Sequence, residues 1–427
     1  MSRLAENGGQ GSAPLPKGWR MTRVKRICCM HSGDHIAGDE ICEEGEFPVY
    51  GGNDLRGYYP KYNCEGPMLI VGRQGALCGN VHRIDGKFWA TEHALITTIT
   101  HFDNLDYLYY LLTDLNFNQY VSQSAAQPGL AASKILQVET VLPPRPEQER
   151  IAAFLDEKCA AVDKAIEVKR KQLESIAAMW KDLLSRATTQ GIEGRDARPV
   201  RPPNLANDGG HAGCVTLPSG WRCVRLKDCF SYGKGLNITK VDLVDDGTPV
   251  VSYGQIHSRL NLGTHLGDEL LRYVPDELAK SNPSARLKIG DIVFADTSED
   301  LDGVGNCVVN DVGDGVYAGY HTLIARAKDP RNSKYLSYLF QADCWREQLR
   351  KRACGIKVFS LTQRLLSNVK VALPPRDEQE LIVKHLDTRR CEFDSLAANL
   401  RKQIETLEQY RKSLIHECVT GIRRVMP

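Results

Sequence analysis

Apolar positions that alternate four and three residues apart run through two long segments of the chain. This heptad spacing predicts α-helices that each carry one apolar stripe, as in a coiled coil. We call the stripe residues the seam. In the first segment they are Leu155, Cys159, Val162, Ile166, Lys169, Leu173, Ile176, Trp180, Leu183 and Ala187. In the second they are Leu386, Arg390, Phe393, Ala397, Leu400, Ile404, Leu407, Arg411, Leu414 and Cys418.

The ends of both predicted helices are marked by proline and glycine. Pro143 and Pro144 exclude a helix before Arg145, and acidic residues just after that point suit a helix N-terminus. Gly191 and Gly421 are natural helix stops. Each helix therefore covers about 45 residues, or roughly 65 Å. We expect the two copies within one chain to pair antiparallel about a pseudo-twofold axis. The alternatives are packing of each helix on its own domain and dimerisation between chains.

The helices belong to an internal repeat. LPPRPEQERI at Leu142 returns as LPPRDEQELI at Leu373, and LPKGWRMTRVK at Leu15 returns as LPSGWRCVRLK at Leu217. Each half thus opens with one motif and closes with the other, and the middle of the second half is longer. The boundaries predict a tail at 1–14, a domain at 15–142, a helix at 143–192, a linker at 193–214, a domain at 215–373 and a helix at 374–427.

The two middle segments mix short β-rich runs with helical patterns. PMLIVG at Pro67 and DIVFAD at Asp291 have strand composition, while the tyrosine-rich stretches from Leu105 and from Ser333 are helical in pattern. We therefore predict a mixed α+β fold of two globular domains, separated in sequence by two long coiled-coil helices.

Composition excludes some classes of protein. The chain has 427 residues, of which 42% are hydrophobic and 25% charged, and its net charge is +2. No apolar run is long enough to span a membrane, and no signal-peptide pattern is present, so we expect a cytoplasmic protein. The 14 cysteines lack the spacing of zinc ligands and are expected to be reduced thiols, with no metal site.

Polar and basic residues in the two middle segments are candidates for contact with DNA. Arginine and lysine suit guanine edges and phosphates, and asparagine and glutamine suit adenine edges. Taken singly, each is expected to be an ordinary solvated surface group more often than a base contact. The candidates are Asn53, Arg56, Tyr58, Lys61, Arg73, Gln74, Lys234, Asn237, Lys240, Gln255, Arg259, Thr297, Ser298 and Lys357.

Motifs of catalysis are missing. The chain has no phosphate-binding Gly-x-x-x-x-Gly-Lys-[Ser/Thr] loop and no Asn-Pro-Pro-[Tyr/Phe] motif of amino-methyltransferases. His93 and His321 occupy comparable places in the two halves, and Cys78 precedes His93, but no partner marks any of them as a nucleophile or base. We expect no catalytic residues on this chain.

The order LPxGWR, variable segment, LPPRxEQE and long helix, written twice, resembles the specificity subunit (HsdS) of type I restriction–modification systems. GYYPKYNCEGPMLIVGRQGALCGNVH at Gly57 and LKIGDIVFADTSEDLDGVGNCVV at Leu287 are similar to stretches of that family's target recognition domains. The resemblance covers residues 15–427. The family's recognition loops vary too much for base contacts to be carried over to single residues.

The resemblance implies a DNA-binding subunit that takes part in defence against foreign DNA. Each domain would recognise one half of a bipartite target in double-stranded DNA, and the helix pair would set the gap. Two methyltransferase subunits would dock on the helices, and restriction and translocase subunits would join them. The resemblance implies no cofactor on this chain, with S-adenosylmethionine, ATP and magnesium on the partners.

Three other interpretations stay open. The chain could be the recognition subunit of a type IIB-like system, which the neighbouring reading frames would distinguish. It could be a coiled-coil scaffold that binds only proteins, which predicts no salt-dependent affinity for DNA. It could also be an unrecognised enzyme that uses Cys78 or His93.

Overall fold

The computed structural model of the protein describes residues 15–52, 54–74, 78–100, 103–120, 129–192, 217–353, 355 and 358–426. The chain divides into two compact units. Unit 1 comprises residues 1–170 and 400–427, and unit 2 comprises residues 171–399. Within the described part of the chain, no helix combines the length and the apolar character needed to cross a bilayer.

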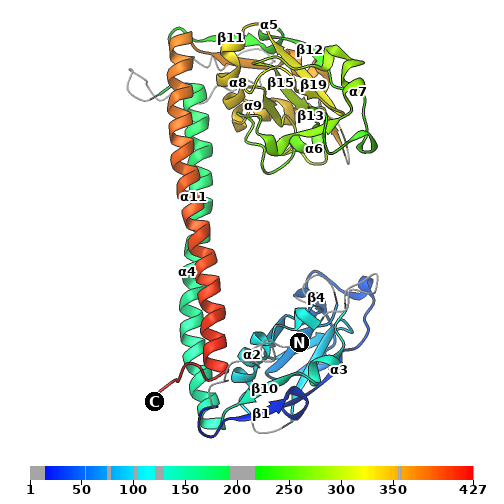
Figure 1. Ribbon diagram of the computed structural model, residues 1–427, viewed down its shortest axis with the longest axis vertical. Helices are drawn as coiled ribbons and strands as arrows, with labels where there is room; N and C mark the ends of the chain where they lie inside the picture. Colours follow the sequence, from blue (N-terminus) through cyan, green and yellow to red (C-terminus); the bar gives the residue numbers. More distant parts are fainter. Residues whose placement is uncertain are drawn as a thin grey trace. The chain divides into compact units, whose positions relative to one another are not determined.

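Unit 1 contains a four-stranded antiparallel sheet and a second, mixed sheet beside it (Figure 1). The first has the order β2 (Cys28–Ser32), β9 (Ala94–Ile99), β6 (Met68–Gly72), β7 (Val81–Ile84). The second has the order β4 (Leu55–Tyr59), β3 (Phe47–Tyr50), β8 (Lys87–Ala90), β5 (Cys64–Glu65). Strands β1 (Arg20–Arg23) and β10 (Glu139–Leu142) pair separately, and the helices are α2 (Leu105–Asp114) and α3 (Ala132–Leu136).

Unit 2 repeats this plan with the same strand order. Its first sheet runs β12 (Phe230–Lys234), β19 (Thr322–Ala327), β15 (Ile292–Ala295), β17 (Cys307–Val309). Its second runs β14 (Arg272–Val274), β13 (Thr248–Val251), β18 (Tyr317–Ala318). Two strand pairs stand apart, β11 (Arg222–Arg225) with β21 (Lys370–Leu373) and β16 (Thr297–Ser298) with β20 (Phe359–Ser360).

The short helices of unit 2 are α5 (Leu226–Cys229), α6 (Tyr253–Ile256), α7 (Asp276–Lys280), α8 (Ser333–Leu339), α9 (Asp343–Arg350) and α10 (Gln363–Asn368). The helical stretch predicted from Ser333 is thus two helices. The break falls at Phe340 and Ala342, which are buried, so core packing overrides the helical pattern there.

The central strand of each first sheet is covered on both faces. Leu69 and Val71 of β6 pack in one core cluster, while the residue between them, Ile70, packs in another with Phe88 of the second sheet. Alternate residues of a strand point to opposite faces, so a strand buried on both sides becomes an unbroken apolar run. In β15 likewise, Ile292 and Phe294 face one core and Val293 faces the other.

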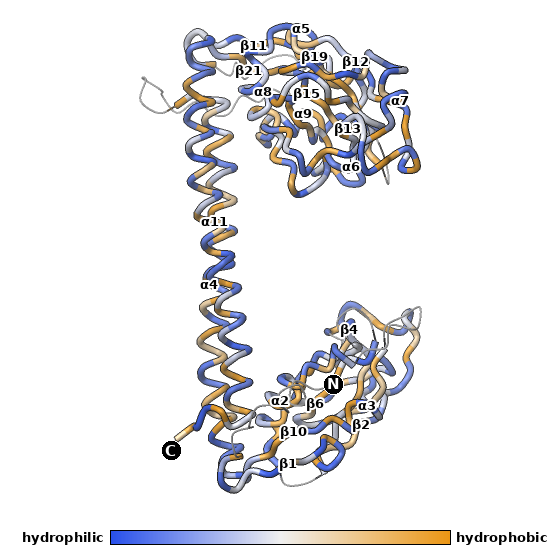
Figure 2. Tube along the Cα trace, in the orientation of Figure 1, coloured by the Kyte–Doolittle hydropathy of each residue, from blue (hydrophilic) through white to orange (hydrophobic). Residues whose placement is uncertain are grey.

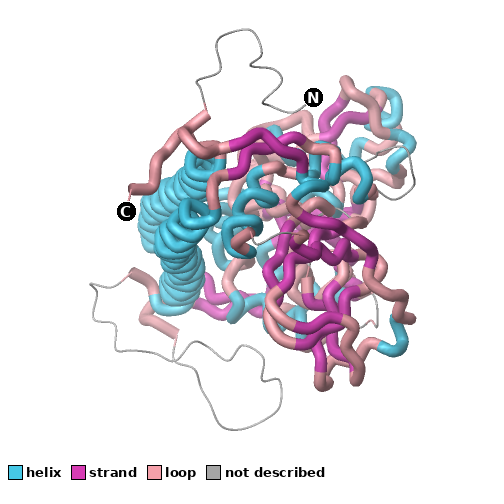
Figure 3. The backbone as a smooth tube through the Cα atoms, turned by 90° about the horizontal axis from the view of Figure 1, so that it is seen from below, coloured by secondary structure: helices cyan, strands magenta, loops and turns pink. Residues whose placement is uncertain are grey.

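Two long helices confirm the heptad prediction, α4 (Arg145–Gln190) and α11 (Arg376–Val419). They lie side by side in Figures 1 and 3 and run antiparallel within each unit. In unit 1, Asp163 contacts Arg411 at 3.0 Å and Arg170 contacts Glu408 at 3.1 Å. In unit 2, Trp180 packs edge to face on Phe393 with ring centroids 6.0 Å apart. Pairing within one chain is therefore the arrangement that the structure shows.

The seam residues are buried or half-buried along both helices, and Figure 2 shows hydrophobic positions recurring along them. Leu155 and Leu386 are fully enclosed, whereas Leu173 and Leu400 are half-buried. Other seam residues are also buried, namely Val162, Ile166, Phe393 and Leu414. The half-buried ones are Ile176, Leu183, Ile404 and Leu407. A two-helix layer covers only one stripe of each helix, so burial is greatest where a domain adds a third layer.

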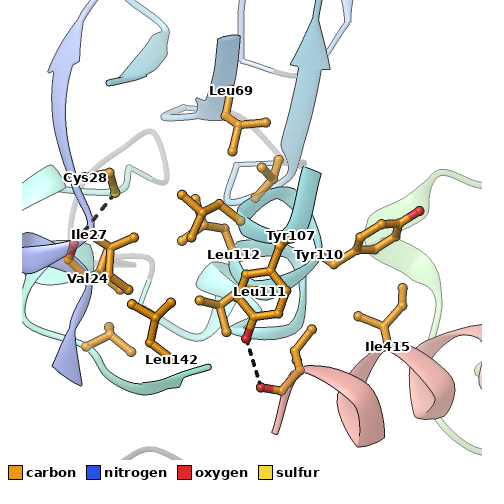
Figure 4. Packing of buried hydrophobic residues seen from close by; sticks show 14 of the residues in the cluster. Val24, Ile27, Cys28, Leu69, Tyr107, Tyr110, Leu111, Leu112, Leu142 and Ile415 are labelled. Carbon is orange, nitrogen blue, oxygen red and sulfur yellow. Dashed lines mark hydrogen bonds between the residues drawn. The ribbon is translucent and has the colours of Figure 1, made fainter. Parts of the chain in front are cut away.

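One joint fastens the domain of unit 1 to the helix pair. Trp19, from the LPxGWR motif, donates its indole N–H to the Glu147 carboxylate at 3.0 Å, at the start of α4. Gly421, just beyond the end of α11, has a left-handed φ of 79°, and a Cβ there would lie 3.3 Å from the Trp19 ring. Tyr107 of α2 donates to the carbonyl of Val419 at 3.3 Å, as Figure 4 shows. The motif therefore binds the start of one helix and the end of the other.

Unit 2 repeats this joint with the same residue types. The Trp221 indole N–H donates to the Glu378 carboxylate at 3.0 Å. Gly191, with a φ of 82°, ends α4 beside the Trp221 ring, and Tyr335 donates to the carbonyl of Thr188 at 3.2 Å. The duplicated motifs thus encode two equivalent joints.

Removing the indole donor tests the strength of the joint. Trp19→Phe is expected to lower the free energy of unfolding of unit 1 by about 1.5–3 kcal/mol, because a buried carboxylate loses a hydrogen bond. Trp89→Phe is the matched control, since among the described residues the Trp89 indole N–H has no hydrogen-bond partner. Denaturant unfolding followed by hydrogen exchange in unit 1 measures both. A loss for Trp19→Phe no larger than for the control contradicts the assignment.

Candidate nucleic-acid interface

The residue that follows the central strand occupies a matched position in the two units. The backbone N–H of Arg73, after β6, donates to the carbonyl of His93 at 2.9 Å. The backbone N–H of Asp296, after β15, donates to the carbonyl of His321 at 3.0 Å. The carbonyl of Arg73 accepts from the backbone N–H of Leu130, and the carbonyl of Asp296 accepts from that of Leu361, both at 2.8 Å. The chain path is the same in both units, but one unit has a cation at this position and the other an anion.

In unit 1 this position lies among polar side chains. The Arg73 guanidinium donates from Nη1 to the Ser32 hydroxyl at 2.6 Å, and Ser32 ends the neighbouring strand β2. No carboxylate pairs with the Arg73 guanidinium among the residues that the structure describes. Gln74 follows and forms an isolated bridge with Gly129. The half-buried Arg73 and Gln74 are therefore held by backbone contacts on both sides.

Glu92 connects two histidines beside this position. Its carboxylate lies 3.1 Å from His35 Nδ1 and 3.4 Å from His93 Nε2. Partial burial acts to raise the pKa of Glu92, but hydrogen bonding, including that from His35, and the nearby imidazoles outweigh it, so the pKa lies below its ordinary value. Glu92 is therefore an anion that holds two imidazoles rather than a proton donor.

In unit 2 the matched position carries an aromatic cluster. Tyr253, Tyr320 and His321 pack edge to face with ring centroids 5.3 to 5.8 Å apart. His321 has a left-handed φ of 53°, which is costly for a residue with a Cβ, and its Nδ1 lies 3.2 Å from the Asp296 carboxylate. The tyrosines are half-buried and His321 is exposed. His321 is thus an exposed ring on a strained backbone, and such backbone strain is concentrated at functional sites.

A hydrogen-bonded chain supports the loop after Asp296. His257 Nε2 contacts the Thr297 carbonyl at 2.8 Å, so Nε2 is the donor and Nδ1 accepts from Asn306 at 3.0 Å. Asn306 in turn accepts from Arg346 at 2.7 Å. These contacts hold the backbone of Thr297 in place and so restrict the orientation of the neighbouring side chains.

The other sequence-predicted contact residues are spread over both units. Asn53 and Lys357 lie outside the described residues. Ser298 is buried, and its hydroxyl donates to the carbonyl of Asp300 at 2.7 Å, so it holds a loop instead of facing outward. Gln255 is half-buried and accepts from the Ser252 amide at 3.3 Å. Tyr58 and Thr297 are also half-buried, and the exposed candidates are Arg56, Lys61, Lys234, Asn237, Lys240 and Arg259.

The structure brings Arg73 and Gln74 together, and it places Lys234 at the end of β12, where Ser32 ends β2 in unit 1. Sequence analysis missed Asp296, because an acidic residue is an unexpected candidate for contact with a polyanion. It also missed Tyr253 and Tyr320, which belong to segments with no shared motif.

Cys78 lacks the features of an activated thiol. Burial raises the pKa of the Cys78 thiol, the opposite of what a nucleophile needs. No group of three or more metal-ligating side chains occurs in the part of the chain that the structure describes. The raised pKa counts against the interpretation of the chain as an enzyme that uses the Cys78 thiol.

Two neighbouring cysteines give a direct test of this packing. Burial raises the pKa of Cys28 to about 12, while the next residue, Cys29, is exposed. A maleimide at pH 8 is expected to modify Cys29 at least about 100-fold faster than Cys28, because the thiolate is the reactive form. Peptide mass spectrometry over a time course measures both sites at once. Equal rates would show that β2 does not pack as described.

The fold and its joints define a class of protein, one in which a duplicated α+β domain is mounted on a long pair of helices. The family described as type I restriction modification DNA specificity domain matches residues 16–178 and 218–408. These two matches cover most of the chain, each spanning one domain and part of a long helix. The chain belongs to this family.

Known proteins agree with the assignment. The chain is 42% identical over 148 residues to the Type I restriction enzyme EcoprrI specificity subunit of Escherichia coli, a match that covers 34% of this chain and 37% of that protein. It is 22% identical over 331 residues to the Type I restriction enzyme MjaVIII specificity subunit of Methanocaldococcus jannaschii, covering 76% of this chain and 71% of that protein.

One solved structure shares the fold. It comes from work titled "Structural basis underlying complex assembly and conformational transition of the type I R-M system", and its chain aligns with a TM-score of 0.66 at 15% identity. The alignment covers 96% of this chain and 100% of the other. At this level of identity the likeness concerns the fold alone, and it confirms the mixed α+β architecture.

Proposed function

We propose that this chain is the DNA specificity subunit of a type I restriction–modification complex. Each domain recognises one half of a bipartite target in double-stranded DNA, and the helix pair sets the number of base pairs between the halves. The chain itself is not catalytic. It directs a methyltransferase, and through further subunits a restriction and translocation activity, to one sequence.

The observation that carries this proposal is the exact duplication of the joint. Trp19 with Glu147 and Trp221 with Glu378 attach two copies of one domain to the same pair of helices in the same way. A protein with one binding site needs no second copy of its anchoring contacts. Two equivalent anchors suit two recognition domains on a spacer, because half-sites in DNA must be matched in separation.

The outer faces of the helices support docking of partner subunits. Large apolar side chains there stay exposed although the seam is covered, namely Val168, Met179, Leu381, Leu396 and Tyr410, which are 46–58% exposed. We assign these faces to two methyltransferase subunits, one for each repeat. The methyl donor S-adenosylmethionine, and ATP with magnesium, belong in this proposal to the partners and not to this chain.

The test is base-modification sequencing of a strain that has no methylation of its own. The strain expresses this chain with the methyltransferase encoded beside it. The expected result is one new methylated motif with two specific halves around a gap of unspecified bases. An active methyltransferase that gains no motif from this chain would refute the proposal.

A domain exchange provides the control for the assignment of halves. Residues 215–373 are replaced by the corresponding segment of a related subunit, and the motif is determined again. Only one half should change, and the other half should be retained at the same gap. A change in both halves would show that the two domains do not act separately.

A further inference from the structure

The inference concerns the matched position that follows the central strand of each first sheet, and it rests on the proposed function. Arg73 and Asp296 lie at this position. The backbone N–H of each donates to the histidine just before β9 or β19, and the carbonyl of each accepts from Leu130 or Leu361. Equivalent backbone positions in two domains of one plan present their side chains in equivalent directions. At this shared backbone position one domain presents a guanidinium and the other a carboxylate.

The side chains at the two positions have opposite hydrogen-bonding roles, one as a donor and the other as an acceptor. Arginine has only donors, and it pairs with the O6 and N7 acceptors of guanine. An ionised aspartate has only acceptors, and it pairs with the N4 amino group of cytosine. Both residues would thus recognise a G·C pair in the major groove, one from its guanine and the other from its cytosine.

The surroundings of Arg73 leave it able to bind a base. Its Nη1 contacts a hydroxyl at 2.6 Å, a neutral acceptor that orients the guanidinium without neutralising its charge. Backbone hydrogen bonds hold the residue on both sides, from its N–H to His93 and from Leu130 to its carbonyl. The side chain is half-buried, so its direction is restricted before DNA binds. A restricted donor gives more discrimination between bases than a freely moving surface arginine.

The surroundings of Asp296 explain how an anion can face DNA. His321 contacts one carboxylate oxygen, and a carboxylate has further acceptor capacity for an amino group. The exposed Lys234 ends β12, beside the strand end that leads to His321, and supplies a positive charge for the phosphates.

We propose that Arg73 and Asp296 are the matched specificity-determining residues of the two domains. Arg73 recognises the guanine of one G·C pair in the half-site bound by unit 1. Asp296 recognises the cytosine of one G·C pair in the half-site bound by unit 2. Tyr253, Tyr320 and His321 position Asp296 through the ring cluster and the contact from His321.

The test uses the full chain in complex with its methyltransferase, with a DNA library in which every position of the wild-type motif is varied. The variants are Arg73→Gln, which replaces the charged guanidinium with a shorter neutral amide, and Asp296→Asn, which changes the hydrogen-bonding pattern with little change in size. Each is expected to reduce the preference for one G·C pair about 10- to 100-fold. Arg73→Gln should alter only one half of the motif, and Asp296→Asn only the other. Exposed residues of the same types give the controls Arg20→Gln and Asp314→Asn, which should leave the motif unchanged.

The outcomes separate this inference from the proposed function. If the wild-type complex has no bipartite motif, the proposed function fails first. If it has one and the variants keep every base preference, the proposed function stands and this inference is overturned. An altered pair that is A·T, or two variants that affect the same half, overturns it as well. Should a variant methylate too slowly to profile, sequencing of the DNA that its complex retains from the library gives the same preferences without turnover.

Discussion

Ile166→Asp is expected to separate the two helices in unit 1 and to abolish recognition of the target. Ile166 lies in the seam of α4 and is 6% exposed. A carboxylate there would be removed from water and left without a donor, while the apolar contact of the isoleucine would be lost. We expect a loss of about 3–5 kcal/mol in the free energy of unfolding of unit 1. Thermal and denaturant unfolding measure the loss, and modification sequencing measures the motif.

The matched control lies two residues further along the same helix. Val168→Asp introduces the same group at a position that is 49% exposed on the outer face. Its cost should stay within about 0.5 kcal/mol, because the carboxylate remains in water. Equal destabilisation by both substitutions would mean that the seam does not hold the helix pair together. Any loss of methyltransferase binding by Val168→Asp at full stability would instead support docking on that face.

Deletion of one heptad from each helix is expected to remove recognition of the wild-type target. The segments are residues 168–174 of α4 and 399–405 of α11, which lie opposite each other in the antiparallel pair. Seven residues keep the seam in phase and shorten the helices by about 10 Å, equivalent to about 3 base pairs. If the shortened protein recognises DNA, both half-sites should be unchanged and the gap shorter by about 3 base pairs.

A deletion in one helix alone is the control for this experiment. Removing only 168–174 shifts one helix against the other, so it should destabilise the pair instead of redefining the gap. Modification sequencing of both variants, with the assembled complex isolated first, distinguishes these results. Methylation of the wild-type motif at its original gap by the double-deletion variant would refute the role of the helices as a spacer.

Much of this architecture could be predicted from residues alone. The heptad spacing through Leu155 and Leu386 predicted two long helices, and the helices begin at the Arg after each Pro-Pro pair. The duplicated motifs predicted two equivalent domains, and the two sheets do have the same strand order. Such signals are local or repeated in the sequence, so the elements that they specify can be predicted without knowledge of the tertiary structure.

The sequence says less about the candidate interface, and the DNA contacts predicted from it stay predictions. Composition favoured basic and amide side chains, but Ser298 holds a loop, and the acidic Asp296 occupies the matched position of Arg73. The position of each side chain in the folded protein depends on strand pairing between segments far apart in the sequence, such as β6 with β9 and β15 with β19. A residue type by itself does not indicate which side chains the pairing brings to one edge.

The sequence by itself determined the duplication, the helix pair and the family, because periodicity and repeated motifs are properties of the chain order. Only the tertiary structure decided why the motifs recur, since Trp19 reaches Glu147 and the end of α11 across more than a hundred residues. It also decided that Arg73 and Asp296 occupy equivalent positions, because backbone hydrogen bonds to matched partners define those positions although the two residues themselves differ. Local patterns fix elements, whereas long-range pairing fixes which side chains can act together.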